Sequence, residues 1–355
     1  GKPEKESRMT LILEEILSEA MRAGASDLHI TVGASPKMRV NGKLVSLSYP
    51  KFMPEDTLEM LISIMTETQR EQFEKQGEYD CSITDRELGR FRVSAYRQRG
   101  CVALAFRLMG VQIPKAEELG IPDSVMEWYQ KETGLIIVTG LSGSGKSATL
   151  AVLLDKINSM RESHIITLES PVEYLHEHKQ SIVEQREIGA DSRSYPAALE
   201  AVLREDPDVI FVGEMRDLET IGEVITAAET GHLVLVSMPV QGTVTAIERM
   251  IDLFPTYRQQ QIRLRLANVL QGVVSQQLLP NERNKNRVSA FEVMQVTSEI
   301  STLIREGKTS HIPAVMERGE VSGMITMDGA VKKLFGEGKI VQETVMWYAQ
   351  RNHNI

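Results

Sequence analysis

The chain has 355 residues, more than one hydrophobic core usually organises, so two or three domains are expected. A formal net charge of -9 and an aromatic content of 5% argue against a protein that grips nucleic acid or an anionic membrane through bulk charge. The two cysteines can build neither a disulfide framework nor a four-cysteine zinc site, and no apolar run approaches the ~20 residues of a membrane-spanning helix.

The first 110 residues predict a mixed α+β domain. Apolar residues recur at helical spacing over residues 9–23, and a second helix is expected over residues 54–72. The Asn41-Gly42 pair is typical of a type I′ hairpin turn, and Cys81 and Cys101 are expected to be small buried hydrophobes in strands. The other strands are expected at residues 28–32, 37–40, 43–47, 91–96 and 102–108.

Residues 111–122 carry two prolines and a glycine and are expected to form a linker. Beyond them, short apolar strands alternate with helices, which predicts a parallel sheet covered by helices on both faces. We therefore predict an ATPase core over residues 123–280 and a mostly helical C-terminal region over 281–355, with a terminal helix pair from Asp328. The core strands are expected at residues 135–139, 164–168, 209–212 and 233–237, and the core helices at 147–160, 195–204 and 218–229.

The most specific motif is Gly140-Leu-Ser-Gly-Ser-Gly-Lys-Ser147, which matches the phosphate-loop pattern G-x-x-x-x-G-K-[ST]. Its glycines let backbone N–H groups turn toward phosphate oxygens, and the following helix directs its positive dipole end to the same place. Lys146 can reach the β- and γ-phosphates of ATP, and the Ser147 hydroxyl can ligate Mg²⁺. An accidental glycine-rich match is disfavoured because the motif lies between an apolar strand and a helix. The residues expected to bind the nucleotide are Gly140, Leu141, Ser142, Gly143, Ser144, Gly145, Lys146, Ser147 and Ala148.

ATP hydrolysis also requires carboxylates near the metal and the attacking water. Glu214 follows an apolar strand, which would present it at the carboxyl edge of the sheet, where ligands bind. Glu169 and Glu173 follow another strand and could polarise water or hold Mg²⁺ through its hydration shell; a solvated acidic loop is the alternative for all three. His232 lies just before a strand, where a structural hydrogen-bonding role and a γ-phosphate sensor are the two interpretations.

Several arginines gather near one hairpin of the first domain. On a monomer they would form a solvated basic face, whereas in a ring they could supply arginine fingers that neutralise charge on the γ-phosphate. They are Arg90, Arg92, Arg97, Arg99 and Arg107.

Motifs along nearly the whole chain resemble the PilT family of type IV pilus retraction ATPases, within the secretion ATPase superfamily. Ser26-Asp-Leu-His-Ile30 and Gly89-Arg-Phe-Arg-Val93 resemble parts of the family's PAS-like N-terminal domain. The segment from Arg204 to Thr220 is similar to its Walker B stretch, and Gly272-Val-Val-Ser-Gln-Gln-Leu278 to another hallmark. Leu303-Ile-Arg-Glu306 preserves half of a C-terminal motif.

The resemblance implies an α/β fold with a RecA-like P-loop core, a PAS-like α+β N-terminal domain and a helical C-terminal region. It implies a homohexamer in which Glu214 is the catalytic glutamate, Glu169 and Glu173 form part of an acidic box, and His232 lies in a histidine box. The arginines that it implies near the nucleotide are Arg92, Arg99 and Arg107. Hydrolysis would power pilus retraction and twitching motility through an inner-membrane platform protein. The ring would be cytoplasmic, at the inner face of that membrane, with no nucleic-acid partner.

Three positions depart from the family's pattern. Ser170 replaces an aspartate, Leu141-Ser142 replaces Pro-Thr in the phosphate loop, and Pro239 replaces a second histidine. Proline has neither a side-chain donor nor an N–H, so the contact of that histidine is lost. One alternative is therefore a divergent nucleotide-binding paralogue with weak or no turnover, which regulates a partner pilus or secretion ATPase. Another is a nucleic-acid motor, which the acidic charge disfavours. The lack of a four-cysteine motif favours retraction over pilus assembly.

Overall fold

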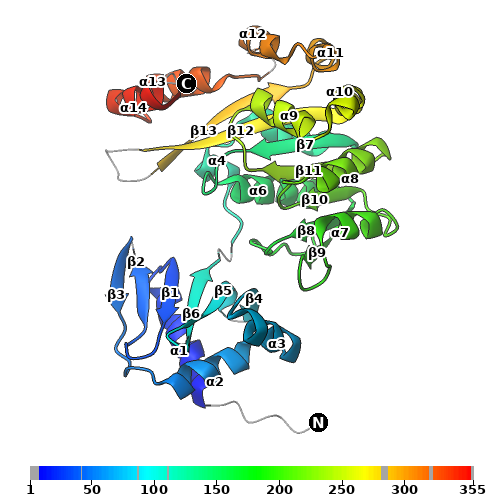
Figure 1. Ribbon diagram of the computed structural model, residues 1–355. Coiled ribbons are helices and arrows are strands. Elements are labelled where there is room, and N and C mark those ends of the chain that lie inside the picture. Colours follow the sequence, from blue (N-terminus) through cyan, green and yellow to red (C-terminus); the bar gives the residue numbers. More distant parts are fainter. Residues whose placement is uncertain are drawn as a thin grey trace. The chain divides into compact units, whose positions relative to one another are not determined.

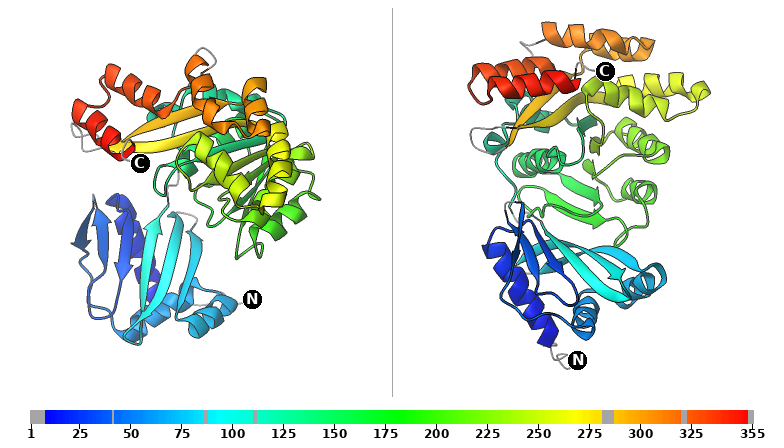
Figure 2. Two further views of the ribbon diagram at one scale, coloured as in Figure 1. Left: turned by 45° about the horizontal axis from the view of Figure 1, so that its top comes forward. Right: turned by 60° about the vertical axis from the view of Figure 1, so that its left-hand side comes forward.

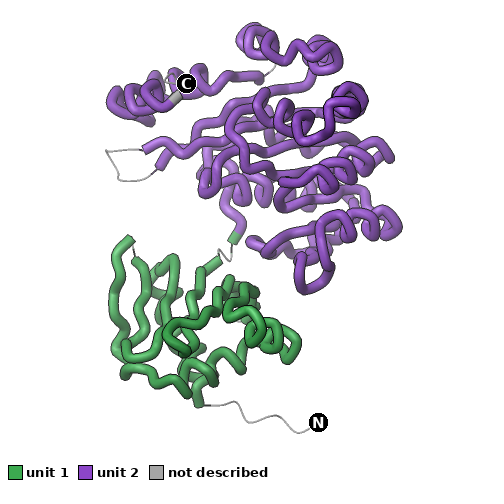
Figure 3. The backbone as a smooth tube through the Cα atoms, viewed as in Figure 1, with its two compact units in different colours: residues 1–112 green, residues 113–355 purple. Residues whose placement is uncertain are grey.

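The structure is a computed structural model that describes residues 8–40, 42–85, 88–109, 112–280, 287–319 and 323–352. It divides the chain into two compact units, Gly1–Gln112 and Ile113–Ile355 (Figure 3). Most of the segment expected as a linker belongs to the second unit, because Ile113, Ala116 and Leu119 pack against its core.

The described residues of the first unit form a six-stranded antiparallel sheet with helices on one face (Figures 1 and 2). The sheet order is β3-β2-β1-β6-β5-β4, and its core joins apolar residues of α1 and α2 to the inward side of the strands. The elements are α1 (Arg8–Arg22), β1 (Asp27–Ile30), β2 (Lys37–Val40), β3 (Lys43–Ser46), α2 (Pro54–Ile64), α3 (Glu67–Gln76), β4 (Glu78–Asp85), β5 (Gly89–Gln98) and β6 (Cys101–Leu108).

Two expectations for this unit need correction. The single helix expected over residues 54–72 is two helices, because Thr66 caps α3: its hydroxyl accepts the Gln69 N–H, and Gln69 Oε1 accepts the Thr66 N–H at 2.9 Å. Cys81 and Cys101 do lie in strands, but both are half-buried rather than fully buried, and Cys81 packs against the edge of the core cluster. Strands β2 and β3 pair as a hairpin, whereas Asn41 of the expected type I′ turn lies outside the described residues.

The second unit contains a seven-stranded sheet in the order β13-β12-β7-β11-β10-β8-β9, parallel except for its edge strand β13. Its first half consists of α4 (Ala116–Leu119), α5 (Asp123–Met126), η1 (Glu127–Gln130), β7 (Gly134–Thr139), α6 (Lys146–Met160), β8 (His164–Glu169), β9 (Ile182–Glu187), α7 (Tyr195–Val202), β10 (Val209–Val212) and α8 (Leu218–Glu229). Its second half consists of β11 (Leu233–Met238), α9 (Thr243–Asp252), α10 (Thr256–Val269), β12 (Leu270–Pro280), β13 (Arg287–Gln295), α11 (Ser298–Glu306), η2 (Thr309–His311), α12 (Ile312–Arg318), α13 (Met327–Gly336) and α14 (Gln342–Asn352).

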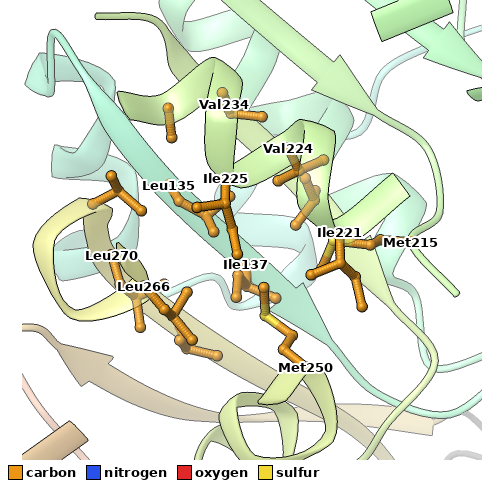
Figure 4. Packing of buried hydrophobic residues seen from close by; sticks show 14 of the residues in the cluster. Leu135, Ile137, Met215, Ile221, Val224, Ile225, Val234, Met250, Leu266 and Leu270 are labelled. Atoms are coloured by element: carbon orange, nitrogen blue, oxygen red, sulfur yellow. The ribbon is translucent and has the colours of Figure 1, made fainter. Parts of the chain in front are cut away.

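Helices cover both faces of this sheet, as the alternating pattern predicts (Figure 1). On one face, Leu135 and Ile137 of β7 pack against Ile221 and Ile225 of α8 and Met250 of α9 (Figure 4). A second cluster joins the other face to α6 and η1. Strands β7, β10 and β11 are buried along their whole length, so the loops that follow them extend from a rigid base.

The chain does not become helical directly after residue 280. Arg287–Gln295 forms β13 and pairs antiparallel with β12, and its Ala290 is buried in an apolar cluster with Leu279 of β12. The terminal helix pair is confirmed as α13 and α14, which pack on Leu279 and Ala290. Strand β9 was also not expected, since Ile182–Glu187 contains mainly polar residues.

Candidate functional site

The phosphate loop connects β7 to α6, and its glycines have backbone angles that favour glycine. The φ angles are 152° at Gly140, 77° at Gly143 and 95° at Gly145, which begins α6 as its N-cap. A Cβ atom at Gly140 would lie 2.5 Å from both the Gln276 carbonyl oxygen and the Ser144 hydroxyl. The loop shape therefore depends on glycine at both ends, as the motif requires.

Lys146 lies over this loop and is almost fully buried. Its Nζ donates hydrogen bonds to the carbonyl oxygens of Gly140 at 2.8 Å and Leu141 at 3.0 Å. Burial lowers the pKa of Lys146, while the charges of Glu214 and Glu173 oppose the shift. Arriving phosphate oxygens would be stronger acceptors for this ammonium than the two carbonyls are.

The rest of the loop also fits a phosphate group. Ser144 Oγ is buried and, among the described residues, has no hydrogen-bond partner. Leu141, Ser142 and Gly143 are exposed at the tip of the loop, whereas Ser147 and Ala148 are half-buried in the first turn of α6. A buried hydroxyl of this kind, in a glycine-rich loop that leads into the N-terminus of a helix, is suited to an anionic oxygen.

The predicted acidic residues lie at the same edge of the sheet. Strands β7, β8, β10 and β11 run parallel, so Glu214, two residues after β10, and Glu169, at the end of β8, share the carboxyl edge with the loop. Strand β11 lies between the strands that precede the loop and Glu214. Glu214 forms an ion pair of 2.7 Å with Arg216 and is 30% exposed, which leaves its carboxylate accessible.

Glu169 is the most perturbed of these carboxyls. It is buried, and burial raises its pKa to about 7, although hydrogen bonds from Thr167 Oγ1 at 2.6 Å and Gln185 Nε2 at 3.1 Å favour the charged form. The nearby Glu173 charge raises the pKa further. A carboxyl group whose pKa is near 7 can exchange a proton at physiological pH.

Gln276 on β12 belongs to this site, although sequence reasoning did not single it out. Its Oε1 accepts the Thr149 hydroxyl of α6 at 2.6 Å, and its Nε2 lies so close to Gly145 that a Cβ there would be 2.7 Å away. Its carbonyl oxygen limits Gly140 at the other end of the loop. In the sequence, Gln276 lies within the hallmark segment 272–278, but that motif does not indicate which of its residues contacts the phosphate loop.

His232 lies at the opposite edge. It precedes β11, whose six residues span about 20 Å at ~3.3 Å per residue, whereas the phosphate loop follows the far end of the neighbouring β7. Its Nδ1 is within 2.9 Å of the Ala227 carbonyl oxygen and 3.1 Å of the Thr230 hydroxyl. These contacts fit the structural interpretation of His232. A γ-phosphate sensor stays a prediction, and it would need a nucleotide other than one at the phosphate loop of the same chain.

The three arginines implied near the nucleotide lie in the first unit, and the phosphate loop lies in the second. Arg92 and Arg107 are register partners on β5 and β6 and form ion pairs of 3.1 Å with Asp80 and Asp27 respectively. Arg99 is exposed in the turn between those strands.

None of the described helices has both the length and the apolar character that a membrane-spanning helix needs.

The parallel sheet, the phosphate loop and the acidic residues at one edge define a P-loop ATPase. The family model described as "Type II/IV secretion system protein" matches residues 2–350. The chain belongs to this family.

Its relatives narrow the class. The type IV pilus ATPase PilU of Pseudomonas aeruginosa is 37% identical over 342 residues, 96% of this chain and 90% of PilU. The type IV pilus retraction ATPase PilT of that organism is 39% identical over 331 residues, 93% of this chain and 96% of PilT. A crystal structure of the pilus retraction motor PilT with bound ADP matches with a TM-score of 0.88 and 45% identity, covering 94% of this chain and 95% of that one. The protein is a PilT-like type IV pilus ATPase.

Proposed function

We propose that this protein is the motor ATPase that powers retraction of type IV pili, and with it twitching motility. The observation that carries the proposal is the phosphate loop with Lys146 and Glu214 at one sheet edge, in a chain similar to PilT over 96% of PilT's length. Similarity over both units supports transfer of the whole motor and not of a nucleotide-binding core alone.

In this proposal each residue of the site has a role. The loop residues 140–148 bind the phosphates of ATP, with Lys146 on the β- and γ-phosphates and the Ser147 hydroxyl as the protein ligand of Mg²⁺, which would neutralise phosphate charge. Glu214 orients the attacking water and accepts its proton. Glu169 and Glu173 support the water and the metal's hydration shell, and the pKa of Glu169 near 7 suits proton exchange.

The active form would be a homohexamer at the inner face of the cytoplasmic membrane. In such a ring, Arg92, Arg99 and Arg107 could approach a nucleotide and stabilise charge on the γ-phosphate. Hydrolysis would move the two units against each other and transmit work to an inner-membrane platform protein that removes pilin subunits. No nucleic acid is expected as a partner, because the chain carries a net charge of -9.

Complementation tests the biological role, and hydrolysis tests the chemistry. In a retraction-deficient host with its pilus machinery intact, the wild-type gene should restore twitching, and Glu214→Gln should not. Purified Glu214→Gln should bind ATP normally but lose turnover by about 100-fold or more, because it lacks the water-activating carboxylate. A well-expressed wild-type gene that leaves the host immobile would contradict the retraction assignment.

A second candidate is a divergent nucleotide-binding paralogue that regulates a partner pilus or secretion ATPase. Pro239 favours it, since this residue follows β11 at the carboxyl edge and offers no donor there. Ser170, next to Glu169, replaces a carboxylate of the family pattern with a hydroxyl. This candidate predicts ATP binding without turnover in the purified assembly; fast hydrolysis that depends on Glu214 would eliminate it.

A further inference from the structure

Tyr195, the first residue of α7, reaches the turn that carries Glu214. A Cβ atom at Gly213 would lie 3.2 Å from the Tyr195 hydroxyl, and equally close to the Leu168 carbonyl oxygen and the Glu169 Cα. The ring of Tyr195 packs against the core cluster beneath the sheet edge. The phenol oxygen is therefore held beside Gly213, at the ends of β8 and β10.

The backbone around Glu214 is fixed from two sides. The Gly213 N–H donates to the Leu168 carbonyl oxygen of β8 at 2.7 Å, and the Gly213 carbonyl oxygen accepts from the Ser237 hydroxyl of β11. The Met215 N–H donates to the Ser237 carbonyl oxygen at 2.9 Å. Between these anchors lies Glu214 itself, and the Tyr195 hydroxyl lies beside this stretch of backbone.

The charges around this phenol keep its proton in place. Burial raises the pKa of Tyr195, and the negative charges of Glu169 and Glu214 raise it further. The hydroxyl therefore remains a neutral O–H group close to both carboxyls, able to accept from the Glu214 backbone and to donate on its other side. Phenylalanine would fill the same space without this group.

We propose that the Tyr195 hydroxyl is a positioning group for Glu214, which holds the Gly213–Glu214 turn so that the carboxylate faces the phosphate loop. The inference rests on the proposed hydrolytic function. It assigns Tyr195 no contact with the nucleotide, so its effect must pass through Glu214.

The test compares Tyr195→Phe with wild type in steady-state ATP hydrolysis by the full chain with Mg²⁺. We expect kcat to fall about tenfold, the size of one lost hydrogen bond, while KM and the affinity for ADP change less than about twofold. The same substitution in a Glu214→Gln background should have no further effect on the residual rate, since the positioned group is already absent. Thermal unfolding of Tyr195→Phe should match wild type within about two degrees.

Tyr129→Phe is the matched control, because it removes a phenol oxygen at the opposite edge of the sheet and should leave kcat unchanged. Equal kcat for Tyr195→Phe and wild type would overturn the inference while leaving the proposed function intact. An equal loss with or without Glu214 would overturn it too, because the effect would then be a general structural one. Wild-type protein that binds ATP without turnover would remove the proposed function and this inference together.

Discussion

The two edges of the seven-stranded sheet carry similar polar chemistry but different geometry. At the carboxyl edge, the glycine-rich loop places Lys146 near the charges of Glu173 and Glu214. At the amino edge, a shallow cavity of about 510 Å³ is lined by polar residues that include Arg161 and His232. Both edges offer cations and acids, so composition alone does not distinguish them.

The difference lies in how their polar groups are satisfied. His232 and Arg161 bond to carbonyl oxygens of their own surroundings, Arg161 Nη1 reaching the Lys131 oxygen at 2.7 Å. At the carboxyl edge, Ser144 Oγ is buried without a partner among the described residues, and the buried Glu169 has its pKa near 7. Buried groups left in this condition indicate a site that is completed by a ligand. The carboxyl ends of the strands therefore carry the candidate site, and the polar groups at their amino ends have structural roles.

Of the substitutions that distinguish the two edges, Lys146→Ala should have the largest effect. It removes the ammonium that bridges the two loop carbonyls, and we expect ATP affinity to fall about 100-fold, the size of a strong charge-assisted hydrogen bond. Fluorescent-nucleotide titration measures this loss. Lys156→Ala, near the other end of the same helix over the Tyr129 ring, is the control and should bind normally. Equal affinity in both variants would argue against the phosphate loop as the binding site.

Glu169→Gln tests whether the buried carboxyl group at the carboxyl edge lowers the stability of the folded protein. The pKa of Glu169 is about 7 in the folded chain and 4.5 in the reference state, so folded protein holds a proton that unfolded protein has released. Wild-type stability should therefore fall as pH rises from 4.5 to 7, and the variant should gain about 2 to 3 kcal/mol relative to wild type over that range.

Urea unfolding at several pH values measures that difference. The control is Glu132→Gln, an exposed acid in the cavity of the amino edge, whose stability difference from wild type should be flat across the same range. If the stability of wild type and of Glu169→Gln changed with pH by the same amount, the buried-carboxyl account would be contradicted.

Gln276→Ala should have a smaller effect at the same edge. It removes the amide beside Gly145 and leaves the buried Thr149 hydroxyl without its partner, so the loop should lose its fixed shape. We expect ATP affinity to fall about tenfold. Thr149→Val removes the other half of the hydrogen bond, and calorimetric titration of both single variants and the double variant measures the coupling. Fully additive losses would show that the pair does not act as a unit.

The sequence predicted well the site residues that directly follow strands. It predicted less well the contacts between residues that are far apart in the chain. The phosphate loop and Glu214 follow strands whose apolar runs are unmistakable, so their edge could be predicted from strand direction. Gln276 lies 127 residues from Thr149, and that contact depends on how β12 pairs with β7. For His232 the sequence left two roles open, because its position just before β11 does not show which groups its ring contacts.

His232→Ala should have the smallest effect and so sharpens the contrast between the edges. Its ring contacts Ala227 and Thr230 at the end of α8, and the whole length of β11 separates it from the carboxyl edge of its own chain. We expect kcat and KM within about twofold of wild type and a loss of stability of about 1 kcal/mol, the value of one hydrogen bond. A fall in kcat of tenfold or more, with unfolding unchanged, would mean that His232 acts on a nucleotide bound outside its own chain. That nucleotide would be bound to a neighbouring copy of the chain. Measuring the rate against protein concentration would then decide, because a contribution between copies is lost on dilution whereas one within a chain is not.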